Sequence, residues 1–281
     1  MKKFILFVSI LFFYGCEKVI NIETEYSNER VVIDASLFKN IKEDFANAIV
    51  KVSKTAPYFS ENNTVIEDAV VFIKTKNGNI KLNFNTEKKY YTNTIDYINF
   101  EENYELLINY KEQNYYSFEK IIQIPEIESV TFGTRKSLQK DKVELLITFT
   151  DPAGIGNYYL WKFGPKGIDN KYDYLTSRDT YIEGNKFTFS FFIDKNEYFK
   201  YDDIIITELS GITKECYDYL NILTSQAGAQ SGRPFSSANA IIKGNIINQS
   251  NPEKFPLGYY RVSEFDYFSL SKLDAPDGVF D

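Results

Sequence analysis

Hydrophobic and polar residues alternate in short runs along most of the chain. The run at residues 48–55 is the clearest, because Val50 and Val52 fall on one face of a strand and the polar residues beside them fall on the other. Comparable runs occupy residues 30–38, 68–75, 79–84, 89–94, 103–110 and 114–124. Seven short strands at this spacing are typical of a β-sandwich, which we predict over residues 30–124.

Asn77-Gly78 lies between two of these runs and predicts a tight hairpin turn. A type I′ turn needs positive φ at both central positions, which Asn and Gly tolerate better than other residues. We therefore expect the strands on either side of this dipeptide to pair.

A second set of runs follows Pro125, and residues 125–129 are predicted to be a linker. The later runs occupy residues 129–134, 142–150, 158–164, 185–193, 203–209, 240–247 and 257–270. They predict a second β-rich domain over residues 130–272, followed by a frayed tail at 273–281. The fold class is therefore mainly β, with two β-sandwich domains, the second carrying one inserted α-helix.

That helix is predicted over residues 213–227. Thr213 is suited to cap its start, and Gly228 is suited to end it. Hydrophobic residues recur at helical spacing along the segment and predict one buried stripe, formed by Cys216, Leu220, Leu223 and Ala227.

The first fifteen residues differ from the rest of the chain. Two lysines precede an apolar run at residues 4–13, which is too short to cross about 30 Å of hydrocarbon and is typical of a secretory signal peptide. Gly15 directly before Cys16 resembles the lipobox of bacterial lipoproteins, in which the Cys thiol receives a diacylglyceryl group before cleavage. We predict a lipoprotein signal peptide at 1–15 and a lipidated tether at 16–29, held in the membrane by acyl chains on Cys16. The alternative is an ordinary signal peptide that contains a Cys.

Glu17 follows the Cys. The inner-membrane retention signal of such lipoproteins is an Asp at this position, so the resemblance favours the outer membrane. Whether the protein faces the periplasm or the cell surface is left open.

The composition excludes several classes of function. The chain contains no His, so it lacks the imidazole base of Ser-His-Asp and Cys-His catalysis and the usual His-containing zinc sites. Its net charge is −7, with no basic stripe to contact nucleic acid. We predict no catalytic residue, no metal site, no cofactor and no nucleic-acid partner.

Aromatic residues make up 17% of the chain, and two places are candidate binding sites. Tyr159 and Trp161 share one face of a predicted strand and would form a stacking platform, although a lone Trp in a sandwich is more often a core residue. Arg233 and Phe235 lie in a long, exposed loop of small and polar residues, where a charged and an aromatic side chain suit a partner. The alternative for Phe235 is packing onto the helix.

Acidic residues offer weaker candidates. Asp151 and Asn157, in one Pro- and Gly-containing loop, would supply oxygens to Ca²⁺, but one carboxylate is few for such a site and a structural turn is the favoured interpretation. The adjacent acidic pairs at 101–102 and 202–203 point to opposite faces of a strand, so neither pair can flank one glycosidic bond.

Several segments together resemble a family of Bacteroidota lipoproteins known only as a domain of unknown function. They are VVIDASL at 31–37, KTAPYF at 54–59, EDAVVFI at 67–73, IPEIESV at 124–130, DPAGIGNYYLWKF at 151–163, GRPFSSANAIIKGNI at 232–246 and LGYYRVS at 257–263. Members are usually encoded beside TonB-dependent outer-membrane receptors, which implies an accessory role in uptake. The N-terminal domain is in addition similar to immunoglobulin-like and transthyretin-like sandwiches.

The resulting expectation is a non-enzymatic, lipid-anchored outer-membrane protein that binds as an accessory to a TonB-dependent receptor. One alternative is a surface adhesion or spacer module. A second is a His-free carbohydrate-active enzyme, which requires two carboxylates facing each other across a cleft.

Overall fold

The structure is a computed structural model that describes residues 29–56, 64–137, 141–154, 156–168, 171–180, 182–200, 202–229 and 241–280. Within these ranges the chain is mainly β, as the alternating pattern predicts. The first seven strands are β1 (Val31–Asn40), β2 (Ala46–Lys54), β3 (Val70–Thr75), β4 (Gly78–Asn85), β5 (Tyr90–Ile95), β6 (Asn103–Tyr110) and β7 (Gln113–Lys120).

The remaining strands are β8 (Ile127–Phe132), β9 (Lys142–Thr150), β10 (Tyr158–Pro165), β11 (Asp173–Arg178), β12 (Lys186–Asp194), β13 (Ile204–Ile212), β14 (Ile247–Asn248) and β15 (Leu257–Ser271). The helices are α2 (Lys195–Tyr198), α3 (Lys214–Ala229), η2 (Pro252–Lys254) and η3 (Lys272–Asp274). Sequence patterns did not predict β11, and the described part of the strand expected at 240–247 contributes only the start of β14. Among the described helices, none is long and apolar enough to cross a membrane.

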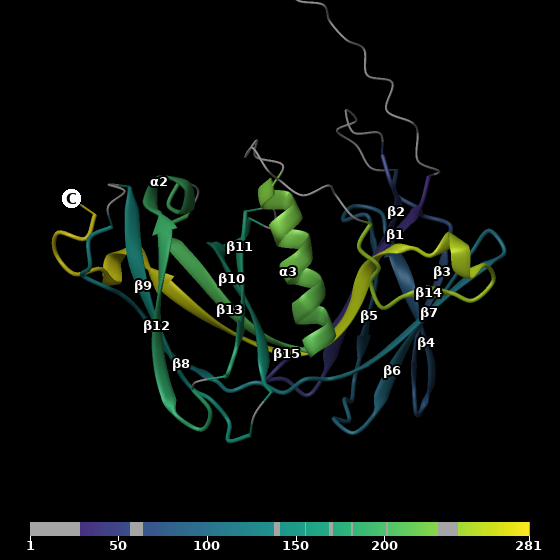
Figure 1. Ribbon diagram of the computed structural model, residues 1–281, viewed down its shortest axis with the longest axis horizontal. Coiled ribbons are helices and arrows are strands. Elements are labelled where there is room, and N and C mark those ends of the chain that lie inside the picture. Colours follow the sequence, from purple (N-terminus) through teal and green to yellow (C-terminus); the bar gives the residue numbers. More distant parts are fainter. Residues whose placement is uncertain are drawn as a thin grey trace, which may run out of the picture.

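One continuous twelve-stranded sheet joins the two predicted halves of the chain. Its order is β11-β10-β13-β15-β1-β2-β5-β4-β3-β6-β7-β14, and a separate three-stranded sheet has the order β12-β9-β8. The long strand β15 lies in the middle, because it pairs in parallel with β1 along residues 257–265 and antiparallel with β13 along residues 265–271. Figure 1 shows two sandwiches side by side, with β15 running between them and α3 across the junction.

In the first sandwich the large sheet folds over on itself. Strand β4 pairs with β5 through residues 83–85 and with β3 through its earlier residues, so it carries the sheet from one layer into the other. Alternating positions of β1 and β2 fill the core with small and aliphatic side chains, such as Ala35, Leu37, Ala48 and Val50, all at most 1% exposed.

In the second sandwich the three-stranded sheet packs on the strands around β10, and the core is rich in aromatic rings. Trp161 of β10 contacts Phe149 of β9 at 5.4 Å and Phe189 of β12 at 4.9 Å between ring centroids. Phe163 of β10 stacks on Phe191 of β12 at 3.9 Å. Aromatic residues therefore join the two layers of this half.

The start of β15 depends on a glycine. Gly258 is paired with Ile33 of β1 and has a φ of +100°, which disfavours other residues. A Cβ atom placed on Gly258 would lie 2.0 Å from the Ile33 carbonyl oxygen. Only a residue without a side chain lets the two backbones approach this closely.

The segment predicted as a linker at 125–129 is held firmly against β15. Glu264 accepts from the Ile124 amide at 3.4 Å, and Asp266 accepts from the Ile127 amide at 2.9 Å. Strand β8 begins inside the predicted linker, at Ile127. Because β15 belongs to the predicted second domain yet pairs with β1 of the first, the two sandwiches share a sheet across the predicted boundary.

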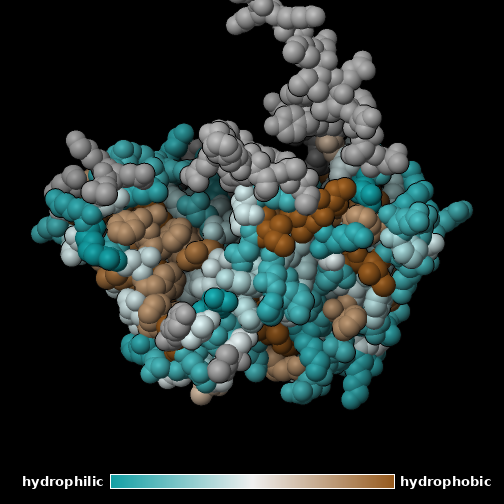
Figure 2. All heavy atoms as spheres, in the orientation of Figure 1, coloured by the Kyte–Doolittle hydropathy of each residue, from teal (hydrophilic) through white to brown (hydrophobic). Residues whose placement is uncertain are grey.

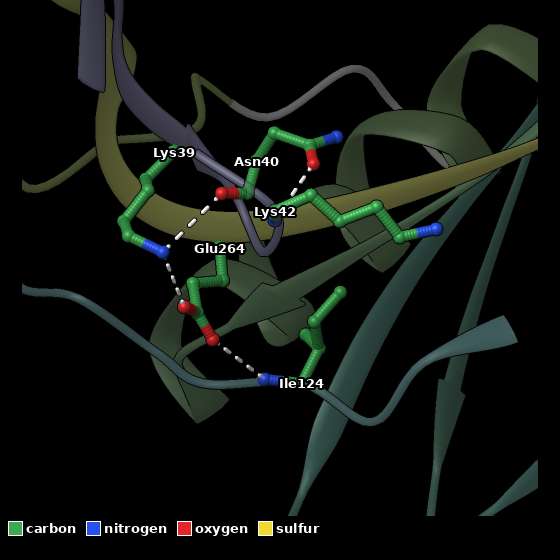
Figure 3. A network of polar contacts seen from close by, with 5 residues as sticks. All are labelled: Lys39, Asn40, Lys42, Ile124 and Glu264. Carbon is green, nitrogen blue, oxygen red and sulfur yellow. Dashed lines mark hydrogen bonds and ion pairs between the residues drawn. The ribbon is translucent and has the colours of Figure 1, made fainter. Parts of the chain in front are cut away.

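A buried ion pair marks this junction (Figure 3). Lys39 continues the inward-facing positions of β1, and its Nζ atom lies 3.1 Å from Oε1 of Glu264, its register partner on β15. The two side chains are only 10% and 8% exposed. Lys39 also donates to the Asn40 carbonyl at 3.2 Å, so both charges have further polar partners at the place where the two cores meet.

Helix α3 begins where it was predicted to begin but ends later than predicted. The Thr213 hydroxyl accepts from the Cys216 amide at 3.2 Å, as an N-cap should, but the helix continues through Gly228 to Ala229. Cys216 is buried, whereas Leu223 is 43% exposed, so the buried stripe is shorter than the spacing predicted. The Ala227 side chain lies outside the described ones.

Strands β3 and β4 pair on either side of the turn, as the Asn77-Gly78 dipeptide predicts, but the turn itself differs from the prediction. Thr75 pairs with Gly78, so the hairpin loop is Lys76-Asn77, and Asn77 is not among the described residues with positive φ. Positive φ at both central positions, as a type I′ turn requires, is found in the turn between β6 and β7, at Lys111 (φ 46°) and Glu112 (φ 63°). This turn contains no Asn or Gly, so the sequence pattern carried no signal for it.

The end of the described chain is packed, although a frayed tail was predicted at 273–281. Phe280 lies edge-on to Phe132 at 5.4 Å and to Phe199 at 5.0 Å. Its carbonyl also accepts from Lys195 Nζ at 3.1 Å. These contacts place the segment on the second core.

Candidate functional site

A polar trough of about 370 Å³ lies on the outer face of the shared sheet. Strand alternation creates its floor, because positions between the core residues of β1 and β15 must point to the opposite face. Thus Ser36 lies between buried Ala35 and Leu37, and the β1–β15 register places it beside Arg261. The polar and charged lining is contributed by Asp34, Ser36, Lys51, Tyr90, Lys162, Tyr172, Tyr174, Glu208, Ser210, Arg261 and Ser263.

The charges in the trough are unequally matched. Lys162 and Glu208 are register partners on β10 and β13 and form an ion pair at 2.8 Å. Arg261 is half-buried, and among the described residues none forms a hydrogen bond or ion pair with its guanidinium. Three cationic and two acidic side chains line the trough, which leaves one net positive charge in a protein of net charge −7.

Serine hydroxyls extend the polar floor. Ser263 is 4% exposed, and its Oγ atom has no hydrogen-bond partner among the described residues. Ser210 donates to Glu208 Oε1 at 3.3 Å. A buried hydroxyl without a partner is costly, so Ser263 stands out from the satisfied polar groups around it.

The other face of the second sandwich opens into an aromatic groove of about 450 Å³. It lies between β11 and β12, which are the edge strands of their sheets. Its lining is mostly apolar and consists of Phe149, Trp161, Leu175, Ser177, Arg178, Ile182, Asn185, Phe187 and Phe189. Figure 2 shows hydrophobic side chains gathered on the lobe that contains β9 and β12.

Tyr159 and Trp161 share a strand face as predicted, but that face is the core and not an exposed platform. Each side chain is 1% exposed. Trp161 donates from Nε1 to the Ser177 hydroxyl at 3.0 Å, and Tyr159 donates to Asp151 Oδ1 at 2.6 Å. Trp161 reaches the groove only as part of its inner wall, so the stacking-platform interpretation is wrong for this pair.

The loop around Asp151 is built as a turn. Asp151 is 1% exposed and its carboxylate accepts from Tyr159, while Asn157 donates to the Gly154 carbonyl at 3.2 Å. Burial raises the pKa of the Asp151 carboxyl, although the hydrogen bond from Tyr159 opposes this. Asp179, which the sequence did not single out, organises the loop by accepting from the amides of residues 156 and 157.

Cys16, Arg233 and Phe235 lie outside the described residues, as does the predicted signal peptide. Among the residues that are described, no three His, Cys, Asp or Glu side chains gather where they could hold a metal ion.

Sequence patterns did not reveal the trough. Its central residues, Ser36 and Arg261, come from strands that are distant in sequence and pair in parallel. The available signal was the polar residues at alternate positions 34 and 36 of the VVIDASL strand and 261 and 263 of the LGYYRVS strand. Only the strand order shows that these two polar faces adjoin.

The fold and the trough together define a mainly β protein of two sandwiches that share a sheet and enclose a polar hollow beside it. The family described as domain of unknown function (DUF4249) matches residues 17–266, and the chain belongs to that family. No curated protein matches the chain.

Proposed function

We propose that this protein is a lipid-anchored binding protein of the outer membrane, held by acylated Cys16 and acting without catalysis as an accessory to a TonB-dependent receptor. The anchor is supported by the lipobox-like segment that ends at Cys16. The receptor association is supported by the resemblance to lipoproteins encoded beside such receptors.

The observation that carries the binding role is the polar trough. Its volume falls in the range of small-molecule sites, and it is lined by Arg261 and by the Ser263 hydroxyl, neither of which has a polar partner among the described residues. Polar groups that the fold leaves unmatched are suited to a ligand, because a ligand can supply the missing partners.

Affinity purification of the full chain from its native membrane, after mild detergent extraction, tests the proposal. Mass spectrometry of the N-terminal peptide is expected to show acyl chains on Cys16, and an outer-membrane receptor is expected to co-purify. Cys16→Ser is the matched control and should abolish both. An unacylated Cys16, or repeated recovery of the anchored protein alone, would contradict the proposal.

A surface adhesion module is the second candidate, because the aromatic groove exposes side chains such as Phe187 on an edge strand. Deletion of the gene separates the two roles. Loss of attachment with intact nutrient uptake would favour adhesion, whereas loss of uptake would favour the receptor accessory.

A further inference from the structure

The strongest unused feature of the molecule is Arg261, one of two cations in the trough that form no ion pair with a described residue; the other is Lys51 of β2, the register partner of Asp34. Arg261 projects from the centre of the shared sheet, where Ser36 of β1 is its register partner. The residue is half-buried, and within the described ranges its guanidinium forms no ion pair. The cation on β10 differs, because Lys162 is already neutralised by Glu208 at 2.8 Å.

We propose that the trough binds a small, hydroxyl-bearing carboxylate, with Arg261 as the residue that holds the carboxyl group. This inference rests on the binding role proposed above and specifies its ligand. A planar guanidinium matches a carboxylate through two parallel N–H···O bonds, and such charge-assisted bonds are stronger than neutral ones.

The neighbouring hydroxyls fit the remainder of such a ligand. Ser36, Ser210 and Ser263 line the same hollow, and the Oγ atom of Ser263 has no partner in the described part of the chain. A hydroxyl group can both donate and accept, so it pairs with sugar-like hydroxyls in either orientation. The Lys162–Glu208 pair adds a further donor and acceptor at the edge of this floor.

The size and charge of the trough limit the ligand further. A volume of about 370 Å³ suits a monosaccharide-sized molecule better than a polymer segment. The local charge of the lining is positive although the chain is acidic, so an anion is attracted to this place in particular. Tyr90 and Tyr172, from opposite ends of the trough, supply aromatic walls for the apolar face of a ring.

Calorimetric titration of the full chain in detergent tests the proposal with three pairs of probes. Each pair consists of an acid and its neutral counterpart: glucuronate and glucose, galacturonate and galactose, gluconate and glucitol. At least one acid should bind, and more tightly than its neutral counterpart. Arg261→Gln should raise the dissociation constant for that acid by at least about tenfold, which is the loss expected when charge-assisted hydrogen bonds are removed.

Two variants keep the result interpretable. Arg178→Gln removes a cation from the aromatic groove and should leave acid binding unchanged. Ser263→Ala should weaken binding without lowering the melting temperature of the unliganded protein, because it removes a hydroxyl that has no partner.

The titration results test the ligand assignment independently of the proposed receptor association. If no acid binds better than its neutral counterpart, or if Arg261→Gln binds the acid as well as the wild type, the assignment of the trough is wrong. Failure of a receptor to co-purify would leave these titrations unaffected, so the two proposals fail independently.

Discussion

The two sandwiches are built on the same sheet but are closed in different ways. In the first, the large sheet folds over on itself and its layers meet mainly through Ala, Val, Ile and Leu side chains, with buried tyrosines such as Tyr104 and Tyr260 among them. In the second, the separate sheet β12-β9-β8 covers the strands around β10, and aromatic rings span the gap. The aromatic groove lies on the side where β11 and β12 are both edge strands.

This difference teaches that hydrophobicity alone does not close a sandwich. The second half is rich in large apolar rings, yet Phe187 of the edge strand β12 remains 37% exposed. In the first half, β4 runs continuously from one layer into the other and joins the two layers. Backbone continuity between the two layers therefore contributes to closing a sandwich, in addition to the size of the core side chains.

The largest expected effect comes from separating the halves at β15. Gly258→Ala places a Cβ against the Ile33 carbonyl at a positive φ, and we expect it to lower the free energy of unfolding by about 4 kcal/mol. Denaturant titration measures the loss, with Trp161 fluorescence reporting the second half and circular dichroism reporting both.

Gly78→Ala is the matched control, because Gly78 also has positive φ but no atom lies within 4 Å of its added Cβ. It should lose only about 1 kcal/mol. If the two variants are equally stable, the close approach of β1 and β15 does not hold the halves together.

The next effect comes from the buried charges at the junction. Lys39→Met leaves the Glu264 carboxylate without its cation in a site that is 8% exposed, and we expect a loss of about 3 kcal/mol in chemical denaturation. Lys74→Met, which breaks the more exposed Lys74–Glu105 pair at 2.8 Å, should lose less than about 1 kcal/mol. Equal losses would show that the junction pair is no more important than a surface pair.

A smaller effect distinguishes the two cores. Phe163→Leu removes the ring that stacks on Phe191 and should cost about 1.5 kcal/mol while altering the fluorescence of nearby Trp161. Ile33→Val in the first core should cost about 1 kcal/mol and leave the Trp161 spectrum of the folded protein unchanged. A spectral change caused by Ile33→Val would mean that the cores are not packed independently.

The smallest effect is a pH dependence within the second half. Because burial raises the pKa of Asp151 above its ordinary value of 3.8, the folded state binds this proton more tightly than the unfolded state. Stability contributed by this group is therefore present at low pH and is lost as the pH rises through the raised pKa. Asp151→Asn keeps an acceptor for Tyr159, and unfolding measured from pH 4 to 7 should show a less negative slope than in the wild type.

Local patterns predicted most strands but not their neighbours. The alternation in residues 31–37 located β1 correctly, because one face of the strand is buried and the other is not. The pairing of β1 with β15 was not predictable in this way, since a parallel pair between distant segments leaves no turn signal. The trough depends on that pairing, so Arg261 and Ser263 could not be selected as site residues from sequence.

Burial explains the other misassignments. Tyr159 and Trp161 were correctly placed on one strand face, but a pattern cannot tell a core face from a ligand-binding face when both are aromatic. Lys111 and Glu112 adopt positive φ because the β6–β7 register leaves exactly two residues for the turn, a tertiary requirement that overrides local preference.

The position of β15 has a consequence for biosynthesis. Lys39 and Glu264 are 225 residues apart, so the strand at the centre of the sheet is synthesised long after its neighbour β1. Until then β1 has an open edge, and neither sandwich can be completed. A nascent chain of this design is expected to keep that edge of β1 unpaired until β15 has been made.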